Sequence, residues 1–399
     1  MKISDEKIEE LLTRGVEEVI VKKDLIKKLK SGRQLRIKHG IDPTTSDLHL
    51  GYAVVYQKLK EFQDLGHKVI FLIGDFTARF GDPTAQKKMR GLRGKEEVLE
   101  LAKNYMAQVG KILDLDKLEI RYNGEWYDKM SAEELLRLVS RFTVARLLER
   151  DMFQERIKAH QEIGYHEPIY PILQGYDSVM LKADLTVCGI DQKFNELLGR
   201  ELQLQFGQPP QDLVLMPLLI GTDGKHKMSQ SLGNYIKITE SPNEMYGKIM
   251  SIPDEIIIHY YQLLTRIDEK EIRKIEKEMK KGILNPRDAK AKLAKEIVTI
   301  YHGKEKAELA EKEFERVFRE RKIPSKIPEY KISLEEAKIN ELIYQIGLVS
   351  SKSEARRMIE QGAVEIDGSV IREFDKKIKL KDKMIIRVGK RRWAKIRTK

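Results

Sequence analysis

Three short apolar runs, each set between stretches with helical periodicity, constrain the fold of this chain more than any other feature. They are HKVIFLIGD (67–75), ADLTVCGIDQ (183–192) and DLVLMPLLIG (212–221). Apolar runs of this length, bounded by turn residues, read as buried strands. Strands that alternate with helices are typical of a parallel sheet with helices on both faces. We therefore predict an α/β domain over residues 1–232, with a doubly wound, Rossmann-like parallel sheet.

The rest of the chain has a different pattern. Residues 252–318 show only helical periodicity, and Asn285-Pro286 reads as the capped start of one helix. Further on, Ser351 and Glu354 have the spacing of a capping box at another helix start. The predicted order after the α/β domain is an α-helical domain over 233–320, a linker over 321–332 and a small α+β domain over 333–399, with a hairpin turn at Asp367-Gly368.

Composition limits the setting and the partners. The 399 residues include 75 Lys and Arg against 63 Asp and Glu, a formal net charge of +12, which favours an anionic partner. The single cysteine, Cys188, excludes an internal disulfide and favours a cytoplasmic location. No apolar run approaches the roughly 20 residues of a spanning helix, so no membrane partner is expected.

The stretch IDPTTSDLHLGY (41–52) places His49 and Gly51, two weak helix formers, at the start of a helix. Ser46 or Asp47 is expected to cap this helix. Because a helix start that follows a parallel strand offers N–H groups to phosphates, the stretch suggests a nucleotide site. His49 would add a donor there, and Gly51 would let a flat base approach the backbone. Taken alone, the stretch also fits an ordinary surface histidine and a tolerated glycine.

A second stretch, GKHKMSQSLGN (224–234), reads as an irregular loop with groups that bind phosphate oxygens. These groups are the side chains of Lys225, Lys227, Ser229 and Ser231. By itself such a loop is also compatible with simple solvent exposure. A histidine–glycine helix start followed far along the chain by a Lys-Met-Ser loop resembles the two-part signature of class I aminoacyl-tRNA synthetases, and this resemblance extends over the whole chain.

A third group of polar residues narrows the resemblance. Tyr170, Gln174 and Asp177 are spaced by four and three residues, which puts them on one face of a helix. A buried carboxylate among them is unfavourable unless it meets a polar ligand group. With its Gln-Gly-Tyr-Asp string, this helix resembles the tyrosine-binding helix of the bacterial tyrosyl-tRNA synthetases.

That resemblance implies a role for each matching residue. Asp177 would accept the phenolic hydroxyl, and the tyrosine-binding set would be Thr77, Asp82, Tyr170, Gln174, Asp177 and Gln192. The ATP-binding set would be Asp42, Thr44, His49, Gly51, Tyr52, Gly189, Asp191, Lys225, Lys227, Met228 and Ser229. The catalytic set would be His49, Tyr52, Lys227 and Gln230. The resemblance also implies Mg²⁺ bound with ATP, no metal ligands assigned to the protein, and a homodimer joined through a connective insertion at about residues 90–165.

The C-terminal stretch SKSEARRMIEQGAVEIDG (351–368) resembles the S-four-type RNA-binding module. Lysines and arginines supply affinity for phosphates, and Trp393 is expected to stack on an unpaired base. The residues expected to bind RNA are Lys352, Arg356, Arg357, Lys390, Arg391 and Arg392. A charge run that only keeps the protein in solution is the alternative interpretation.

Three positions depart from the family pattern. Tyr52 stands where the first signature usually has a second histidine, and Gln230 stands where the loop usually has a second lysine. Because charge-assisted hydrogen bonds are about twice as strong as neutral ones, both changes predict a lower rate, for which Lys225 is placed to compensate. The strand before GIDP also lacks a tyrosine, so the side chain that pairs with Asp177 at the phenol is left open.

The resemblance implies the activity of a tyrosine–tRNA ligase. The enzyme would activate L-tyrosine with ATP, release pyrophosphate, and transfer tyrosine from tyrosyl-adenylate to the terminal adenosine of tRNA(Tyr). Two alternatives stay open. One is a class I synthetase for tryptophan or another aromatic amino acid, and the other is a synthetase-like RNA-binding protein that has lost activity through Tyr52 and Gln230.

Overall fold

The structure is a computed structural model that describes residues 3–82, 93–318, 327–389 and 392–398. The chain divides into two compact units, Met1–Lys312 and Glu313–Lys399. Among the described residues, no helix is long and apolar enough to cross a membrane.

The first unit is built on a six-stranded sheet with the strand order β1-β6-β5-β2-β3-β4. Five strands are parallel to their neighbours, which confirms the predicted doubly wound sheet. They are β6 (Asp212–Met216), β5 (Leu185–Gly189), β2 (Arg36–Ile41), β3 (Lys68–Ile73) and β4 (Glu119–Tyr122). The sixth, β1 (Glu18–Ile20), is an antiparallel edge strand that the sequence did not predict, because three residues are too few to show a strand period.

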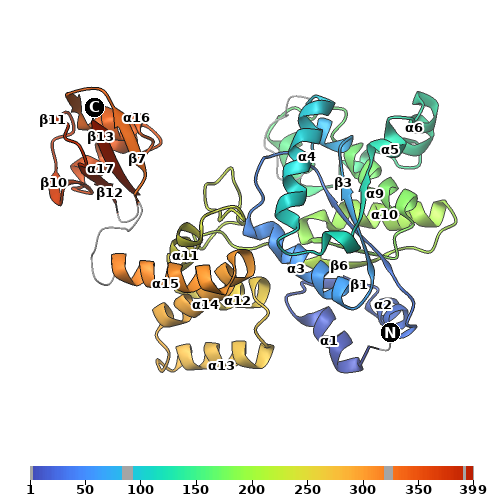
Figure 1. Ribbon diagram of the computed structural model, residues 1–399. Coiled ribbons are helices and arrows are strands. Elements are labelled where there is room, and N and C mark those ends of the chain that lie inside the picture. The colour runs from blue at the N-terminus through green and yellow to red at the C-terminus, as the bar shows by residue number, and fades with distance from the viewer. Residues whose placement is uncertain (1–2, 83–92, 319–326, 390–391, 399) are drawn as a thin grey trace. The chain divides into compact units, whose positions relative to one another are not determined.

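Strand β2 lies where the order of the sheet reverses. The chain runs from β2 outward to β3 and β4, and then returns to β5 on the other side of β2. Because such crossovers are right-handed, α3 (Leu50–Asp64) and the pair α9 (Tyr170–Leu181) and α10 (Lys193–Gln205) lie on opposite faces of the sheet (Figure 1). Sheets of this kind bind ligands beyond the carboxyl ends of the strands at the reversal, here the ends of β2 and β5.

Helices α9 and α10 meet backbone to backbone. A Cβ atom added to Gly175 would lie 2.9 Å from the backbone nitrogen of Gly199, so neither position has room for a larger residue without a shift. This close crossing brings the polar residues of α9 and α10 within hydrogen-bond distance of one another.

Short helices surround the sheet. At the N-terminus these are α1 (Asp5–Thr13) and α2 (Lys22–Lys30), and after β3 they are η1 (Thr77–Arg79), α4 (Lys95–Val109), η2 (Leu115–Lys117), α5 (Gly124–Tyr127), α6 (Ala132–Val139), α7 (Val144–Leu147) and α8 (Asp151–Lys158). The connective insertion expected at about residues 90–165 therefore contains β4, a strand of the main sheet. Its first residues, 90–92, lie outside the described residues.

After the sheet, the first unit continues as a group of helices, drawn in yellow to orange in Figure 1. They are α11 (Pro242–Met250), η4 (Asp254–Ile256), α12 (Ile257–Leu264), α13 (Glu269–Lys280), α14 (Pro286–His302) and α15 (Lys304–Phe318). The second unit begins within α15, at Glu313. The predicted start of α14 is confirmed, because the Asn285 side chain accepts a hydrogen bond from the Arg287 N–H at 2.9 Å. Helix α12 packs against α3 and α14 and thereby joins the helical part to the α/β part.

The second unit has a five-stranded sheet in the order β10-β9-β12-β13-β7 and a two-stranded sheet of β11 and β8. The bounds are β7 (Glu329–Ile332), β8 (Glu336–Lys338), α16 (Ile339–Gln345), α17 (Lys352–Glu360), β9 (Val364–Ile366), β10 (Ser369–Ile371), β11 (Lys377–Lys379), β12 (Ile385–Val388) and β13 (Arg392–Thr398). The predicted hairpin turn is confirmed, with φ of 46° at Asp367 and 84° at Gly368.

The predicted capping box at α17 is only half formed. The Ser351 hydroxyl accepts from the Glu354 N–H at 3.1 Å, as expected. However, the Glu354 carboxylate accepts from Ser350 and pairs with Arg392, instead of reaching back to the N–H of Ser351. The second half of the box was therefore wrong, because a nearby cation and a neighbouring N–H compete for the same carboxylate.

Candidate active site

Helix α3 begins at Leu50, and His49 is its cap. The backbone of His49 is extended (φ −121°, ψ 170°), and its Nδ1 accepts a hydrogen bond from the Gly51 N–H at 3.1 Å. The expectation that Ser46 or Asp47 caps the helix was wrong, because the helix begins only at Leu50 and the Asp47 carboxylate is paired with Lys237 at 2.9 Å.

The capping contact defines the chemical state of His49. Burial, together with the nearby charge of Lys227, lowers the pKa of His49 to about 4, so the ring is neutral near pH 7. Because Nδ1 accepts a hydrogen bond, Nε2 carries the proton of the neutral ring. The Tyr52 ring lies beside it, with 4.6 Å between the two ring centroids. His49 is therefore a neutral N–H donor at the mouth of α3.

The Lys-Met-Ser loop meets this helix start. Leu50 donates its N–H to the Ile236 carbonyl at 2.9 Å, and Ile238 donates to the Leu48 carbonyl at 2.9 Å. A Cβ on Gly51 would lie 3.8 Å from Cβ of Met228. The two stretches, about 180 residues apart in the sequence, thus lie side by side at the carboxyl end of β2.

The loop side chains have different partners. Lys227 lies between the two strand ends, with its Nζ 3.4 Å from Oδ2 of Asp191, which follows β5. The Gln230 amide donates to the Asp47 carbonyl at 2.5 Å and to Oγ1 of Thr45 at 3.3 Å. Gln230 therefore ties the loop to the segment before α3. Ser229 and Ser231 share a hydrogen bond at 2.9 Å, and Lys225 is exposed.

Asp42 was expected in the ATP-binding set, but it is bonded to two residues of the expected tyrosine-binding set. Its carboxylate accepts from the hydroxyls of Thr77 at 2.8 Å and Tyr170 at 2.9 Å. Burial raises the pKa of Asp42 to about 7, against the effect of these two hydrogen bonds, and the neighbouring Asp82 and Asp177 raise it further. Thr44, two residues on, is half-buried.

Asp177 is buried on α9 and has two donors that the sequence did not predict. The Trp126 indole Nε1 lies 3.1 Å from its Oδ1, and the Asn123 amide lies 3.4 Å from its Oδ2. Burial raises the pKa of Asp177 to about 7, while Lys38, Asn123, Tyr127 and Trp126 oppose the rise. Asn123 and Trp126 follow β4, so a search for polar residues directly after each predicted strand would have found them.

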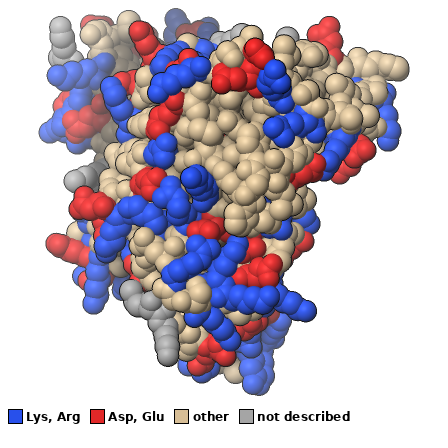
Figure 2. All heavy atoms as spheres, turned by 90° about the vertical axis from the view of Figure 1, so that its right-hand side faces the viewer, with Lys and Arg blue, Asp and Glu red and all other residues tan. Residues whose placement is uncertain are grey.

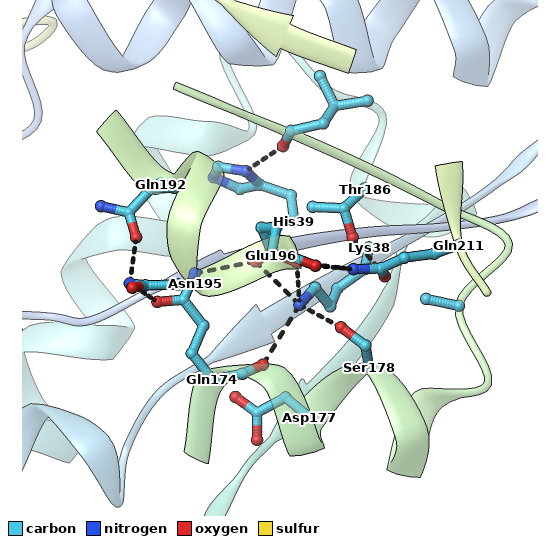
Figure 3. Close-up of polar contacts among 12 residues, drawn as sticks. Lys38, His39, Gln174, Asp177, Ser178, Thr186, Gln192, Asn195, Glu196 and Gln211 are labelled. Atoms are coloured by element: carbon cyan, nitrogen blue, oxygen red, sulfur yellow. Dashed lines mark hydrogen bonds and ion pairs between the residues drawn. The ribbon is translucent and has the colours of Figure 1, made fainter. Parts of the chain in front are cut away.

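Strand β2, which lacks the tyrosine of the family pattern, carries a buried lysine. Nζ of Lys38 lies 2.8 Å from Oε2 of Glu196 and 2.7 Å from the Ser178 hydroxyl. Glu196 also accepts from the Gln174 amide at 2.8 Å, and Asn195 links Gln174 to Gln192, as Figure 3 shows. Gln192 in turn donates to Asp82 at 3.1 Å. Lys38, Asn195 and Glu196 were missed as site residues, because their partners lie on separate elements.

Two sets of residues expected in the site thus meet at one edge of the sheet. One set surrounds the start of α3, with Lys227 and Asp191 beside it, and Gly189 ends β5. The other set lies on α9, α10 and the segment after β3 and forms two hydrogen-bond networks. In one, Asp42 and Asn123 link Thr77, Tyr170 and Asp177. In the other, Asn195 links Gln174 to Gln192, which bonds to Asp82.

Sequence comparison identifies the family that this geometry belongs to. Residues 30–319 match the family described as "tRNA synthetases class I (W and Y)", and residues 320–396 match "Tyrosine--tRNA ligase SYY-like C-terminal domain". The tyrosine–tRNA ligase of Carboxydothermus hydrogenoformans is 50% identical over 97% of both chains, and that of Thermotoga maritima is 48% identical over 97% of this chain and 96% of its own. The chain belongs to the tyrosine–tRNA ligases.

Solved structures agree on the fold of this ligase. The tyrosyl-tRNA synthetase of Archaeoglobus fulgidus, solved as a complex with L-tyrosine, is 25% identical with a TM-score of 0.61, covering 77% of this chain and 99% of its own. A truncated mitochondrial tyrosyl-tRNA synthetase from Aspergillus nidulans has a TM-score of 0.64 at 24% identity, covering 78% and 94% of the two chains.

The C-terminal unit of the ligase presents some of the expected RNA-binding residues more openly than others. Lys352 and Arg357 are exposed on α17, and Arg356 is exposed with its guanidinium 2.7 Å from Glu360. Arg392 donates to the Leu348 carbonyl at 2.7 Å and pairs with Glu354, so it is partly occupied within the protein. One face of Trp393 is covered by Arg387 at 5.1 Å. Lys390 and Arg391 lie outside the described residues.

Proposed function

We propose that the site at the ends of β2 and β5 activates tyrosine with ATP and passes it to the terminal adenosine of tRNA(Tyr). The observation that carries this assignment is the meeting of the His49 helix start and the Lys227 loop at the sheet edge that also carries Asp42, which is bonded to Thr77 and Tyr170 of the amino-acid set with its buried acid, Asp177. The names of the relatives, tyrosine–tRNA ligases at 46–50% identity, support the same reaction.

In the proposed tyrosine pocket, Asp177 accepts the substrate phenol. Trp126 and Asn123 hold its two oxygens and fix the direction of the remaining lone pairs. Asp82, Tyr170 and Gln174 bind the ammonium group, with Thr77 and Gln192 beside them. Asp42, bonded to both Thr77 and Tyr170, adds negative charge next to the same cation. A pocket with an acceptor at one end and acids at the other fits tyrosine and excludes an amino acid without a ring hydroxyl.

In the proposed ATP site, the tyrosine carboxylate attacks the α-phosphorus in line, and pyrophosphate leaves. Because no covalent bond to the enzyme forms, the protein acts by positioning and by stabilising the developing charge. His49 donates a hydrogen bond from its Nε2–H and Lys227 one from its ammonium group. Tyr52 and Gln230 lie at the same helix start. The remaining contacts are assigned to Asp42, Thr44, Gly51, Gly189, Asp191, Lys225, Met228 and Ser229.

Mg²⁺ enters this scheme as part of the ATP substrate. Among the described residues, no group of three or more His, Cys, Asp or Glu side chains is placed to hold a metal ion. Phosphate oxygens and water are the usual ligands of a nucleotide-bound Mg²⁺. The role proposed for the protein is to bind the triphosphate to which the ion is coordinated.

We assign the reaction to the cytoplasm. A reducing compartment is consistent with the single cysteine, Cys188, which has no disulfide partner.

We also propose that the ligase is a homodimer. Figure 2 shows one face with a broad central area free of lysine, arginine, aspartate and glutamate. The helices on this side expose Leu136 on α6 (66%) and Leu204 on α10 (60%). Apolar areas of this kind mark contacts between proteins. Leu136→Glu with Leu204→Glu should convert a dimer to a monomer in light scattering, whereas Leu309→Glu, on exposed α15, should not. A wild-type monomer contradicts the proposal.

Tyrosine-dependent exchange of pyrophosphate into ATP tests the central assignment. Exchange should require tyrosine and be slower with phenylalanine by a factor of about 10⁴ or more, because phenylalanine leaves the buried Asp177 unpaired. Exchange with tryptophan in place of tyrosine, or none with any amino acid, would contradict the assignment and favour one of the two alternative functions.

A further inference from the structure

A buried ion pair lies directly behind the proposed tyrosine pocket. The Lys38 and Glu196 side chains are only 1% and 3% exposed. The Lys38 ammonium donates to Glu196 at 2.8 and 3.0 Å, to the Ser178 hydroxyl at 2.7 Å and to the backbone carbonyl of Gln174 at 3.5 Å. Since all three N–H bonds of this ammonium have protein acceptors, Lys38 does not need a contact with substrate.

Glu196 determines which way the neighbouring amides point. An ionised carboxylate only accepts hydrogen bonds. Gln174 turns its Nε2 toward Oε1 of Glu196 at 2.8 Å, and Gln211 turns its Nε2 toward Oε2 at 2.9 Å (Figure 3). The Gln174 carbonyl oxygen must therefore face away from Glu196, and there it accepts from Asn195 at 2.7 Å.

The direction of the Gln174 amide matters for an ammonium ligand. An ammonium group has three donors and no acceptor, so it binds an amide oxygen and is repelled by an amide N–H. Asn195 occupies only one of the two lone pairs of the Gln174 oxygen. The other remains for the substrate, and the same oxygen is linked through Asn195 and Gln192 to Asp82.

We propose that Glu196 is a positioning residue that fixes the polarity of the Gln174 amide, so that the pocket offers an oxygen to the substrate ammonium, with Lys38 as its counter-charge. This inference rests on the proposed role of Gln174 in tyrosine binding. A buried ion pair adds little net stability compared with apolar residues of equal volume. Its use here is to hold an acceptor-only group against an amide that has two possible orientations.

The first test is Glu196→Gln, measured by calorimetric binding of three ligands. In this variant Lys38 captures the new amide oxygen, and the new NH₂ group faces Gln174 or Gln211, so the Gln174 orientation is no longer fixed. Tyrosine and tyramine, which both carry the ammonium, should bind about tenfold more weakly, the equivalent of one hydrogen bond to a charged group. The analogue 3-(4-hydroxyphenyl)propionate, which lacks the ammonium, should bind as it does to wild type.

Gln211→Leu is the matched control. It removes the second amide bonded to Glu196 but leaves Glu196 as the acceptor for Gln174. Tyrosine, tyramine and the analogue should all keep their wild-type affinities. If Glu196→Gln does not fold, Lys38→Met with Glu196→Met removes both charges at similar volume and should show the same loss for ammonium ligands only. The melting temperature of each variant is measured alongside.

Equal weakening of all three ligands by Glu196→Gln, or weakening of none, overturns the inference. Gln174→Ala separates this failure from failure of the proposed pocket. If Gln174→Ala leaves tyramine binding unchanged, the assigned ammonium site is wrong. If Gln174→Ala weakens tyramine but Glu196→Gln does not, the pocket stands and only the positioning role of Glu196 is lost.

Discussion

The two sides of the active site are built in contrasting ways. On the proposed nucleotide side, the start of α3 and the segment from Lys227 to Ile238 are joined by backbone hydrogen bonds and by side-chain contacts of Gln230 and Lys237 with Asp47, and Lys227 itself remains 39% exposed. On the amino-acid side, Asp177 and its donors Trp126 and Asn123 are buried and joined by side-chain hydrogen bonds. With the roles proposed above, the contrast predicts that the groups on the nucleotide side can adjust to a charged ligand, whereas those on the amino-acid side are already fixed without one.

Replacing His49 with alanine should have the largest effect on the nucleotide side. The rate of adenylate formation should fall by about 100- to 1000-fold, as when one donor to a developing charge is removed, with the Kd for tyrosine nearly unchanged. His49→Asn is the control, since asparagine also caps helices and carries an N–H donor, and it should retain more of the rate. Equal loss of rate and of tyrosine binding in stopped-flow measurements would show that the two sides are not separate.

The corresponding change on the amino-acid side is Asp177→Asn. Here kcat/KM for tyrosine should fall by about 100-fold, because a charge-assisted hydrogen bond is lost and the Trp126 and Asn123 donors lose their anionic acceptor. Activity with phenylalanine should change far less, so the ratio of the two kcat/KM values should shrink. The KM for ATP serves as the control and should stay the same. A fall confined to kcat would contradict the assignment of Asp177 to ground-state binding.

The pH dependence should differ between the two sides. The pKa values of Asp42 and Asp177 are raised to about 7, so these acids are ionised above pH 7 and protonated below it. Where one ionised acid is required, kcat/KM for tyrosine should fall about tenfold between pH 8 and pH 6. The pKa of His49, about 4, predicts no matching change in kcat/KM for ATP. An equal fall of kcat/KM for tyrosine and for ATP over this pH range would contradict the predicted difference between the two sides.

Gln230→Lys should have the smallest effect. This change restores the lysine usual in the family loop, but the Gln230 side chain is directed to Asp47 and Thr45. We expect the rate of adenylate formation to rise by no more than about threefold, the scale of a weakly coupled exposed charge. A rise of about 100-fold would instead show that position 230 reaches the phosphates during the reaction.

The residues proposed for the nucleotide side are easier to recognise in the sequence than those around the proposed amino-acid side, and the reason is physical. His49 and Lys227 lie in short stretches whose composition departs from what a helix or a simple loop requires, so they are visible locally. Asn123, Trp126, Lys38 and Glu196 acquire their roles only through contacts between separate elements. The parallel sheet was predictable because strand and helix periods are local, whereas the three-residue β1 and the actual helix cap were not.

The Gly175–Gly199 contact has a consequence for how the pocket can change. Helix α9 carries Gln174 and Asp177, the residues proposed for the two ends of the amino acid, and α10 carries Asn195 and Glu196, which bond to Gln174. At Gly175 and Gly199 the two helices pack together without side chains between them. The two helices cannot slide along or move away from each other without opening a cavity in the protein interior. Selectivity in this ligase can therefore be retuned by exchanging individual side chains, while the spacing between the ring end and the ammonium end of the pocket stays constant.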